Sequence, residues 1–165
     1  MARSALGSLP QFVTAAVTQG SADAFATTRI ETGISTAARY AWMIDRVEFF
    51  YDLATMAAAI AGANSGEVQI VQGAVPTALV SPTSADFVCC SRFVNRSDGT
   101  EANFQTILPL RDEWVAPENF VVVDAAIHLS IDSTATGQSL THVIRLWYWP
   151  VELSEMDILR MLALR

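Results

Sequence analysis

The segment FVVVDAAIHLSIDSTATGQSLTHVIRLWYWPVEL, residues 120–153, decides the fold class of this chain. In residues 120–131 apolar side chains occupy the odd positions, and polar side chains stand at several of the even positions. This period of two is typical of a β-strand that buries one face. Residues 132–138 are rich in turn-forming residues, and residues 140–149 return as a strand that is apolar on both faces. The segment predicts a β-hairpin whose second strand is covered on both sides, by a helix of the same chain or by another subunit.

Further stretches upstream have the composition of strands. They are residues 24–34, 40–51, 67–75, 86–95 and 103–108. Turns are expected at residues 64–66 and 97–100, and a loop at residues 109–118. Several short strands separated by turn signals at intervals of about 8–12 residues are typical of a sandwich or barrel. The predicted fold class is therefore all-β, a jelly roll or β-sandwich of about eight strands.

Two short helices are expected beside the strands. Residues 52–62 are rich in alanine, begin at a good N-cap, Asp52, and end at a glycine. Near the C-terminus, Ser154 and Asp157 have the spacing of a capping box, and a wide apolar stripe follows. The sequence therefore predicts a short internal helix and a C-terminal helix.

The chain divides into three parts on these signals. An N-terminal arm covers residues 1–22, the β-sandwich domain covers residues 23–152, and the C-terminal helix covers residues 153–165. The arm lacks sustained periodicity and places Gly, Ser, Pro and Gln between short apolar pairs. An isolated segment of this kind is poorly ordered, so its apolar residues suit docking on a neighbouring subunit.

The composition indicates a surface with few charges. Of 165 residues, 52% are apolar and 16% are charged, and the basic residues are ten arginines with no lysine. Soluble monomers usually cover themselves with lysine and glutamate, and contiguous apolar surface is usually covered by a partner. An all-arginine set is also what a GC-rich genome produces, although arginine suits fixed ion pairs at interfaces. We therefore expect this chain to work inside an assembly.

Charge and hydropathy exclude some classes of partner. The formal net charge is −7 and the arginines form no run, which argues against binding to bare nucleic acid. No stretch approaches the ~20 apolar residues of a membrane helix. The N-terminus does not have the pattern of a signal peptide. We expect no cofactor and no metal.

A histidine cluster is the first candidate for chemistry. His128 and His142 would lie opposite each other on the predicted hairpin, with Asp124 on the same face as His128. Two imidazoles and a carboxylate could hold a metal ion or exchange protons. The alternative is an exposed polar face.

A second candidate is a group of charges in residues 40–51. Asp45 and Glu48 could act as paired carboxylates of a hydrolase. Their spacing puts them on opposite faces of a strand, so an ion pair of Arg46 on a solvated edge is the alternative.

Acidic residues also surround Trp114 in the expected loop. Asp112, Glu113 and Glu118 could hold a hard cation such as Ca²⁺, or could be solvated charges. The adjacent cysteines Cys89 and Cys90 are expected to be small buried side chains, because neighbours in a strand point to opposite faces.

The layout resembles the single jelly-roll coat proteins of small non-enveloped icosahedral viruses. The resemblance covers residues 24–152 and includes a Ser/Thr/Ala-rich arm, a succession of strands, and a closing strand VIRLWYWPVELS, residues 143–154. It implies a structural protein of the virion that is assembled in the host cytoplasm. Coat proteins that package single-stranded RNA usually have a basic arm, whereas the first 28 residues here contain Arg3 as their one basic residue. A genome contacted by other proteins or enclosed by an internal membrane fits this composition better.

These observations predict a self-assembling capsid subunit that forms an icosahedral shell. Its partners would be copies of itself and a second capsid protein. Subunit contacts are predicted at Leu9, Phe12, Val13, Trp147, Trp149, Ile158 and Leu162. The alternatives are a phage-type accessory subunit for decoration, adaptor or tail, and a barrel enzyme or ligand-binding protein that uses the histidines.

Overall fold

Ten strands and one helix make up the part of the chain that the computed structural model describes. The described residues are 9–20, 24–35, 39–51, 62–97, 105–106, 111–134 and 140–163. The strands are β1 (Gln11–Gln19), β2 (Ala26–Glu31), β3 (Tyr40–Tyr51), β4 (Gly62–Gln72), β5 (Phe87–Ser97), β6 (Gln105–Thr106), β7 (Arg111–Val115), β8 (Val121–Val122), β9 (Ala126–Ser133) and β10 (Leu140–Glu152), and the helix is α2 (Glu155–Ala163). The predicted internal helix at residues 52–62 falls almost wholly outside the described residues.

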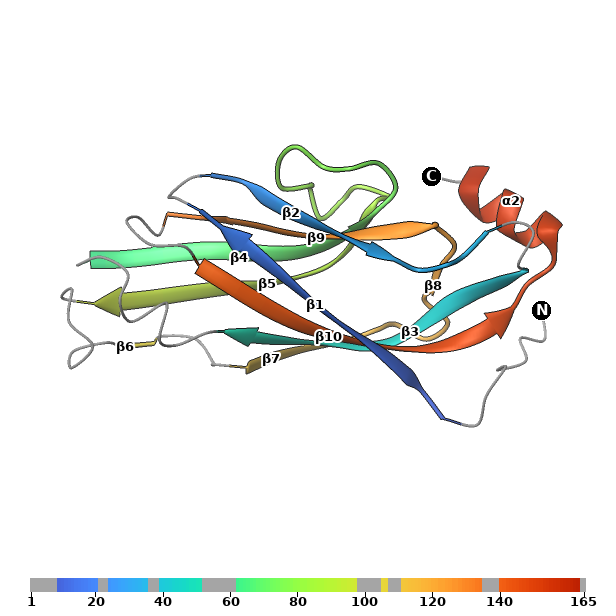
Figure 1. The fold of residues 1–165 in the computed structure, drawn as a ribbon, viewed down its shortest axis with the longest axis horizontal. Coiled ribbons are helices and arrows are strands. Elements are labelled where there is room, and N and C mark those ends of the chain that lie inside the picture. The colour runs from blue at the N-terminus through green and yellow to red at the C-terminus, as the bar shows by residue number, and fades with distance from the viewer. Residues whose placement is uncertain are drawn as a thin grey trace.

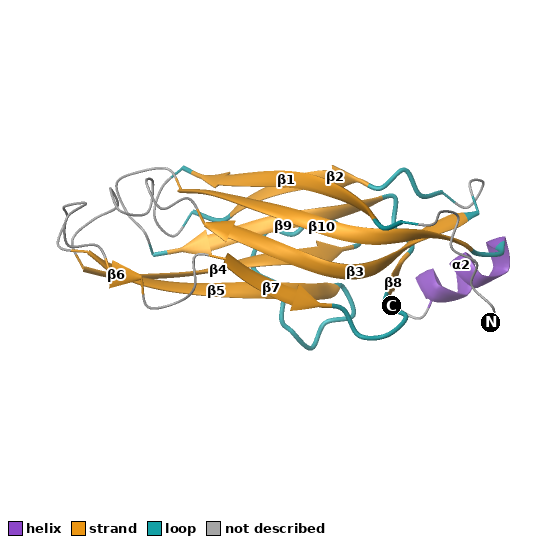
Figure 2. Ribbon diagram, turned by 90° about the horizontal axis from the view of Figure 1, so that it is seen from below, coloured by secondary structure: helices purple, strands orange, loops and turns teal. Residues whose placement is uncertain are grey.

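The strands form two antiparallel sheets that pack face to face (Figure 1, Figure 2). Sheet A has the order β1-β10-β3-β7, with β8 also paired to β3. Sheet B has the order β2-β9-β4-β5-β6. The first strand therefore lies beside the last, and the second strand beside the next to last. This is the strand order of a jelly roll. The all-β prediction is confirmed, with eight longer strands and two strands of two residues each.

The core lies between the two sheets because alternate residues of each strand point inward. Its largest fully buried side chains come from both sheets: Phe49, Ile144 and Leu146 from sheet A, and Ile70, Phe93, Ile127, Leu129 and Ile131 from sheet B. Each such burial stabilises the fold by about 1.5–3 kcal/mol before the entropy of ordering is subtracted. The apolar odd positions of residues 127–131 are thus core positions, as the period of two predicted.

The predicted hairpin of residues 120–149 is wrong in its pairing. β9 pairs with β2 and β4 in sheet B, whereas β10 pairs with β1 and β3 in sheet A. Residues 121–122 belong to a separate strand, β8, of sheet A. The pattern failed here because a period of two reports which face of a strand is buried and not which strand lies beside it.

The prediction of an arm is wrong for residues 11–19, which form β1. This strand pairs with β10 along its whole length, from Gln11 opposite Tyr148 to Gln19 opposite Leu140. Val17 is buried in the core, and Val13 packs against it. Alanine and threonine at several positions weaken the apolar alternation of residues 11–19. The sequence therefore did not predict a strand there.

Two segments that the sequence predicts as a turn and as part of a loop are also strands in the structure. Residues 64–66, predicted as a turn, lie within β4, where Gly66 lets the backbone approach Phe93 and Ser133 closely. Residues 111–115, predicted as part of a loop, form β7.

Helix α2 packs against sheet A on the side away from the core. Ile158 of the helix joins Ala41, Val151 and Leu153 in a second apolar cluster, and Met43 and Trp149 pack against it. Ser154 is confirmed as the N-cap, because the Asp157 backbone N–H donates to Ser154 Oγ at 3.2 Å, and Ser154 Oγ in turn donates to the Asp157 carboxylate at 2.8 Å. Within the described residues, no helix is long and apolar enough to cross a membrane.

The outer face of sheet B is covered in part by the loop of residues 73–86, the green loop at the top of Figure 1. Gln69 holds this loop from β4. Its Nε2 donates to the Val80 carbonyl at 3.0 Å, and its Oε1 accepts from the Val80 N–H at 2.8 Å. Gln72 Nε2 donates to the Ala85 carbonyl at 3.1 Å. Gln69 on the outer face of β4 and Gln72 on its core-facing side therefore both serve to attach the loop.

Candidate functional site

The outer face of sheet A carries a continuous set of arginine, aromatic and aliphatic side chains. Strand register places them in three rows across β1, β10, β3 and β7. The rows are Phe12, Trp147, Arg46 and Val115; Thr14, Arg145, Glu48 and Glu113; and Ala16, Val143, Phe50 and Arg111. Directly opposed side chains in a sheet are about 4.5–5.5 Å apart at Cβ, so the members of each row contact one another. We call these twelve residues the outer surface of sheet A.

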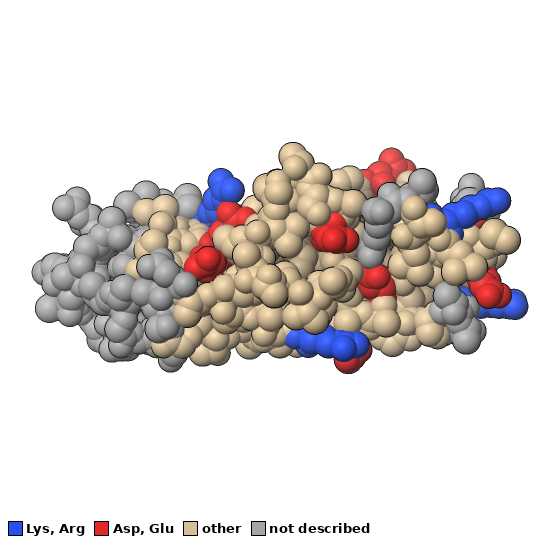
Figure 3. Space-filling view, turned by 90° about the horizontal axis from the view of Figure 1, so that it is seen from above, with Lys and Arg blue, Asp and Glu red and all other residues tan. Residues whose placement is uncertain are grey.

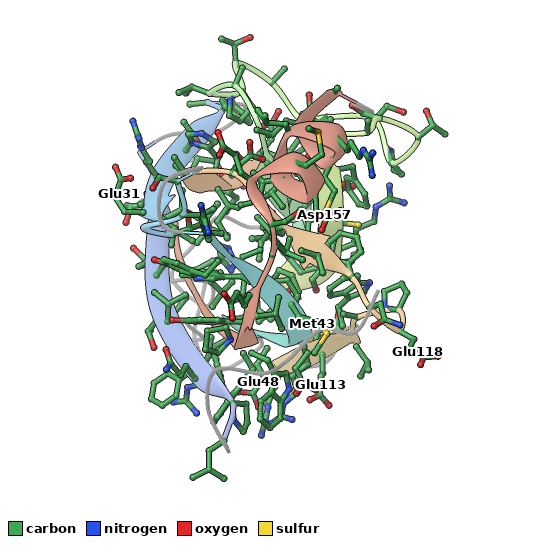
Figure 4. The ribbon with its side chains drawn as sticks, turned by 90° about the vertical axis from the view of Figure 1, so that its right-hand side faces the viewer. Glu31, Met43, Glu48, Glu113, Glu118 and Asp157 are labelled. Carbon is green, nitrogen blue, oxygen red and sulfur yellow. The ribbon has the colours of Figure 1, made fainter. Side chains whose placement is uncertain are left out.

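Glu48 lies at the centre of this surface and is 3% exposed. The indole Nε1 of Trp147 donates to its Oε2 at 2.9 Å, and Arg111 forms an ion pair with its Oε1. Arg145 lies 3.7 Å from Oε2. The hydrogen bond from Trp147, together with the charges of Arg111 and Arg145, lowers the pKa of the Glu48 carboxyl, and its burial acts in the opposite direction. Figure 4 shows Glu48 beside Glu113 on this side of the molecule.

The Glu48→Gln variant is expected to lower the free energy of unfolding by about 2 kcal/mol at pH 7, because it leaves Arg111 and Arg145 without the carboxylate that they share. Urea unfolding would measure the loss. The matched control is Glu113→Gln, since the Glu113 side chain is 46% exposed and its loss should cost less than about 0.5 kcal/mol.

The same pair of variants gives a pH test. The pKa of Glu48 is lowered in the folded state, so its contribution is present above the ordinary value of 4.5 and is lost as the pH falls through the lowered pKa. The difference between wild type and Glu48→Gln should therefore persist at pH 5 and shrink at pH 3. A difference that grows on acidification would contradict the assigned role of Glu48.

Arginine side chains lie over the aromatic rings of this surface. The guanidinium carbon of Arg145 is 5.2 Å from the centre of the Phe12 ring and 5.6 Å from that of Phe50. Arg46 lies 4.7 Å above the Trp147 ring and also pairs with Asp45 and Glu113. Each stacked pair contributes about 0.5–1 kcal/mol at an exposed site. These contacts therefore fix the side-chain conformations of the outer surface of sheet A in the isolated subunit.

The predicted subunit contacts fall into two groups. Leu9 and Phe12 are 74% and 55% exposed, and Leu162 of α2 is also exposed. Trp147 is half-buried on the outer surface of sheet A. These four remain candidates for contact with a partner.

The other three predicted contacts are used inside the chain. Ile158 is buried in the cluster between α2 and sheet A, and Trp149 packs against the same cluster. Val13 packs on the main core. Packing within one subunit explains their apolar character. Ile158 is buried and so does not fit a subunit contact, whereas contact at the half-buried Val13 and Trp149 stays a prediction.

The predicted histidine cluster does not form. His128 lies on β9 in sheet B and His142 on β10 in sheet A, and both are buried, so the alternative of an exposed polar face is wrong as well. His142 packs between the rings of Tyr51 and Phe93, with centroids 5.0 and 4.9 Å away. His128 lines a recess with Asp124 and Arg29, where burial lowers the pKa of the imidazole.

The predicted acidic candidates are structural. Asp45 pairs with Arg46 at 3.0 Å, and β3 lies between β10 and β7, so the predicted solvated edge is wrong. Glu113 pairs with Arg46 at 3.3 Å, and Glu118 is exposed in the turn after β7. In the described part of the chain, no group of three His, Cys, Asp or Glu side chains could hold a metal ion.

Asp112 belongs to a hydrogen-bonded chain that enters the core. Ser91 Oγ donates to Asp112 Oδ2 at 2.6 Å, and the Tyr51 hydroxyl bonds to Ser91. Burial raises the pKa of Tyr51 to about 12, so this hydroxyl keeps its proton at neutral pH. This series of hydrogen bonds satisfies buried polar groups, and it does not activate a nucleophile.

Cys89 is buried, Cys90 is half-buried, and both thiols are free. Burial raises the pKa of each thiol, which makes both poor nucleophiles. The expectation of small structural side chains is met for Cys89.

Several residues of the outer surface of sheet A were not predicted from the sequence, among them Phe50, Arg111 and Arg145. Arg145 could have been found, because it lies two residues before Trp147 in a strand and so shares its face. Arg111 could not have been predicted, because its contact with Glu48 depends on the pairing of β7 with β3.

Neither the comparison with protein-family models nor the comparison with curated protein sequences finds a match for this chain. Its function must therefore be argued from its surface.

Proposed function

We propose that this chain is a structural subunit that assembles with copies of itself into the shell of a virion. The exposed apolar side chains of sheet A, of α2 and of Leu9, which precedes β1, carry the proposal. Leu9, Phe12 and Val115 are 74%, 55% and 68% exposed, and three residues of α2, Met156, Leu159 and Leu162, are also exposed. Exposed apolar patches rimmed by polar residues mark sites of protein contact.

The chemistry of the outer surface of sheet A supports a protein partner. Aromatic residues and arginine are enriched at protein interfaces, and lysine is depleted. This surface contains three arginines and three aromatic rings, and the whole chain has no lysine. Glu48 fixes two of the arginines in place, which reduces the entropy lost on association.

The jelly-roll strand order supports the virion as the setting, because the sequence resemblance to coat proteins implies the same order. One fold serves many functions, so the surface and not the fold is the stronger support. The face shown in Figure 3, opposite to that of Figure 2, has scattered charges on a largely uncharged surface. With a net charge of −7, the genome would be contacted by a second protein or enclosed by a membrane.

Negative-stain electron microscopy of the purified chain tests this proposal. Closed shells of uniform diameter are the expected result. Small rings or trimers would favour the accessory subunit of a phage instead. Isolated single subunits at micromolar concentration would contradict both.

A further inference from the structure

Strand β1 is a long sheet edge without charge. It forms one edge of sheet A, and its sequence QFVTAAVTQ contains no charged residue and no proline. Other described edges differ. β2 carries the Arg29–Glu31 ion pair, β7 carries three charged residues, and β6 and β8 have two residues each. Charges, prolines and short length are the means by which proteins prevent edge pairing, and β1 uses none of them.

The backbone of β1 can accept another strand. β1 pairs with β10 on one side, so alternate N–H and C=O groups point away from the sheet. Within the described ranges, no backbone hydrogen bond from a segment other than β10 reaches residues 11–19. Such a row of free donors and acceptors is a template for an added strand.

The odd positions of β1 are the same when the strand is read in reverse about Ala15, whereas the even positions differ. An antiparallel copy centred there places Gln11 opposite Gln19, Val13 opposite Val17, and Ala15 opposite itself. It also places Thr14 opposite Ala16 and Phe12 opposite Thr18. Every odd residue meets an odd residue, so the core-facing side of one strand continues the core-facing side of the other.

We propose that two copies of this chain pair through β1, antiparallel about a two-fold axis at Ala15, so that their A sheets form one continuous sheet. The proposal rests on the self-assembly proposed above and names one of its contacts. A second copy is the occupant because a two-fold interface must be self-complementary, and β1 is uncharged and pairs identical residues at its odd, core-facing positions. Phe12, which is 55% exposed on the outer surface, would then lie beside Thr18 of the partner subunit.

A charge-swap experiment tests the pairing. Thr14 and Ala16 are exposed on the outer face and would lie opposite each other across the axis. The double variants Thr14→Lys/Ala16→Lys and Thr14→Glu/Ala16→Glu therefore place like charges directly opposite, and each should associate about tenfold or more weakly than wild type. A 1:1 mixture of the two should regain association, because lysine then meets glutamate. Sedimentation velocity at several concentrations would measure all three samples.

The control is Ser81→Lys/Thr83→Lys, which adds the same charge to exposed positions of the loop over sheet B and should leave β1 pairing unchanged. Urea midpoints would show that each variant is folded. Variants that keep the wild-type size, or a mixture that fails to recover it, would overturn β1 pairing. Because wild-type protein would still assemble in either case, the proposed function would stand. A monomeric wild type would overturn both.

Discussion

The Ile158→Ala variant is expected to lose about 3 kcal/mol of its free energy of unfolding. Ile158 is 1% exposed and packs with Ala41, Val151 and Leu153 between α2 and sheet A. Truncation removes apolar contact and leaves a cavity that a helix tied to the end of β10 cannot close. Urea unfolding followed by tryptophan fluorescence suits the measurement, because Trp149 packs against the same cluster.

The matched control on the same helix is Leu159→Ala. Leu159 is the next residue and is 46% exposed, so its truncation should change stability by less than about 0.5 kcal/mol. Both variants should be measured at several protein concentrations, which separates the stability of the subunit from the contribution of assembly. An Ile158→Ala variant with unchanged stability but weakened assembly would instead place Ile158 at a subunit contact.

The Gly66→Ala variant is expected to lose about 3 kcal/mol through overpacking. A Cβ at this position would lie 2.4 Å from the Phe93 ring and 2.5 Å from Ser133 Cβ. Phe93 is buried in the core, so a movement of its ring would disturb the side chains packed around it. Thermal unfolding followed by circular dichroism would measure the loss.

A double-mutant cycle with Phe93→Leu identifies the cause. Removing the aromatic ring relieves part of the collision, so Gly66→Ala should cost less in the Phe93→Leu background than in wild type. Equal costs in the two backgrounds would mean that the ring of Phe93 does not limit position 66.

Local features of the fold could be predicted from the sequence. The aromatic and β-branched run of residues 40–51 is strand β3 with the expected bounds, and Ser154 is the N-cap of α2. These features depend on residues that are close together in the chain, where periodicity and capping chemistry act directly.

The pairing of strands could not be predicted in the same way. In a jelly roll each sheet joins strands from distant parts of the chain, as in the contact between Gln11 and Tyr148, which are 137 residues apart. β9 and β10 lie in different sheets, and nothing in the sequence of residues 132–138 distinguishes such a connection from that of a hairpin. The histidine cluster failed for this reason, because its geometry depended on a β9–β10 pair.

The candidate site likewise combines residues that the sequence indicates with contacts that depend on strand pairing. Glu48 was noticed as a charge in an apolar strand, but its burial depends on Trp147 and Arg111, which are 99 and 63 residues away. Phe12 was predicted as a contact because it is an apolar residue of the expected arm, and the structure places it instead on β1. Its neighbours on the outer surface of sheet A became visible only with the register of β10 and β3.

The mass of the wild-type protein in solution, measured by light scattering at micromolar concentration, tests self-assembly most directly. The exposed side chains of sheet A and α2, together with the open edge of β1, predict particles many times heavier than the 17.9 kDa subunit. A single species of 17.9 kDa that persists as the protein is concentrated would contradict the proposed role as a shell subunit.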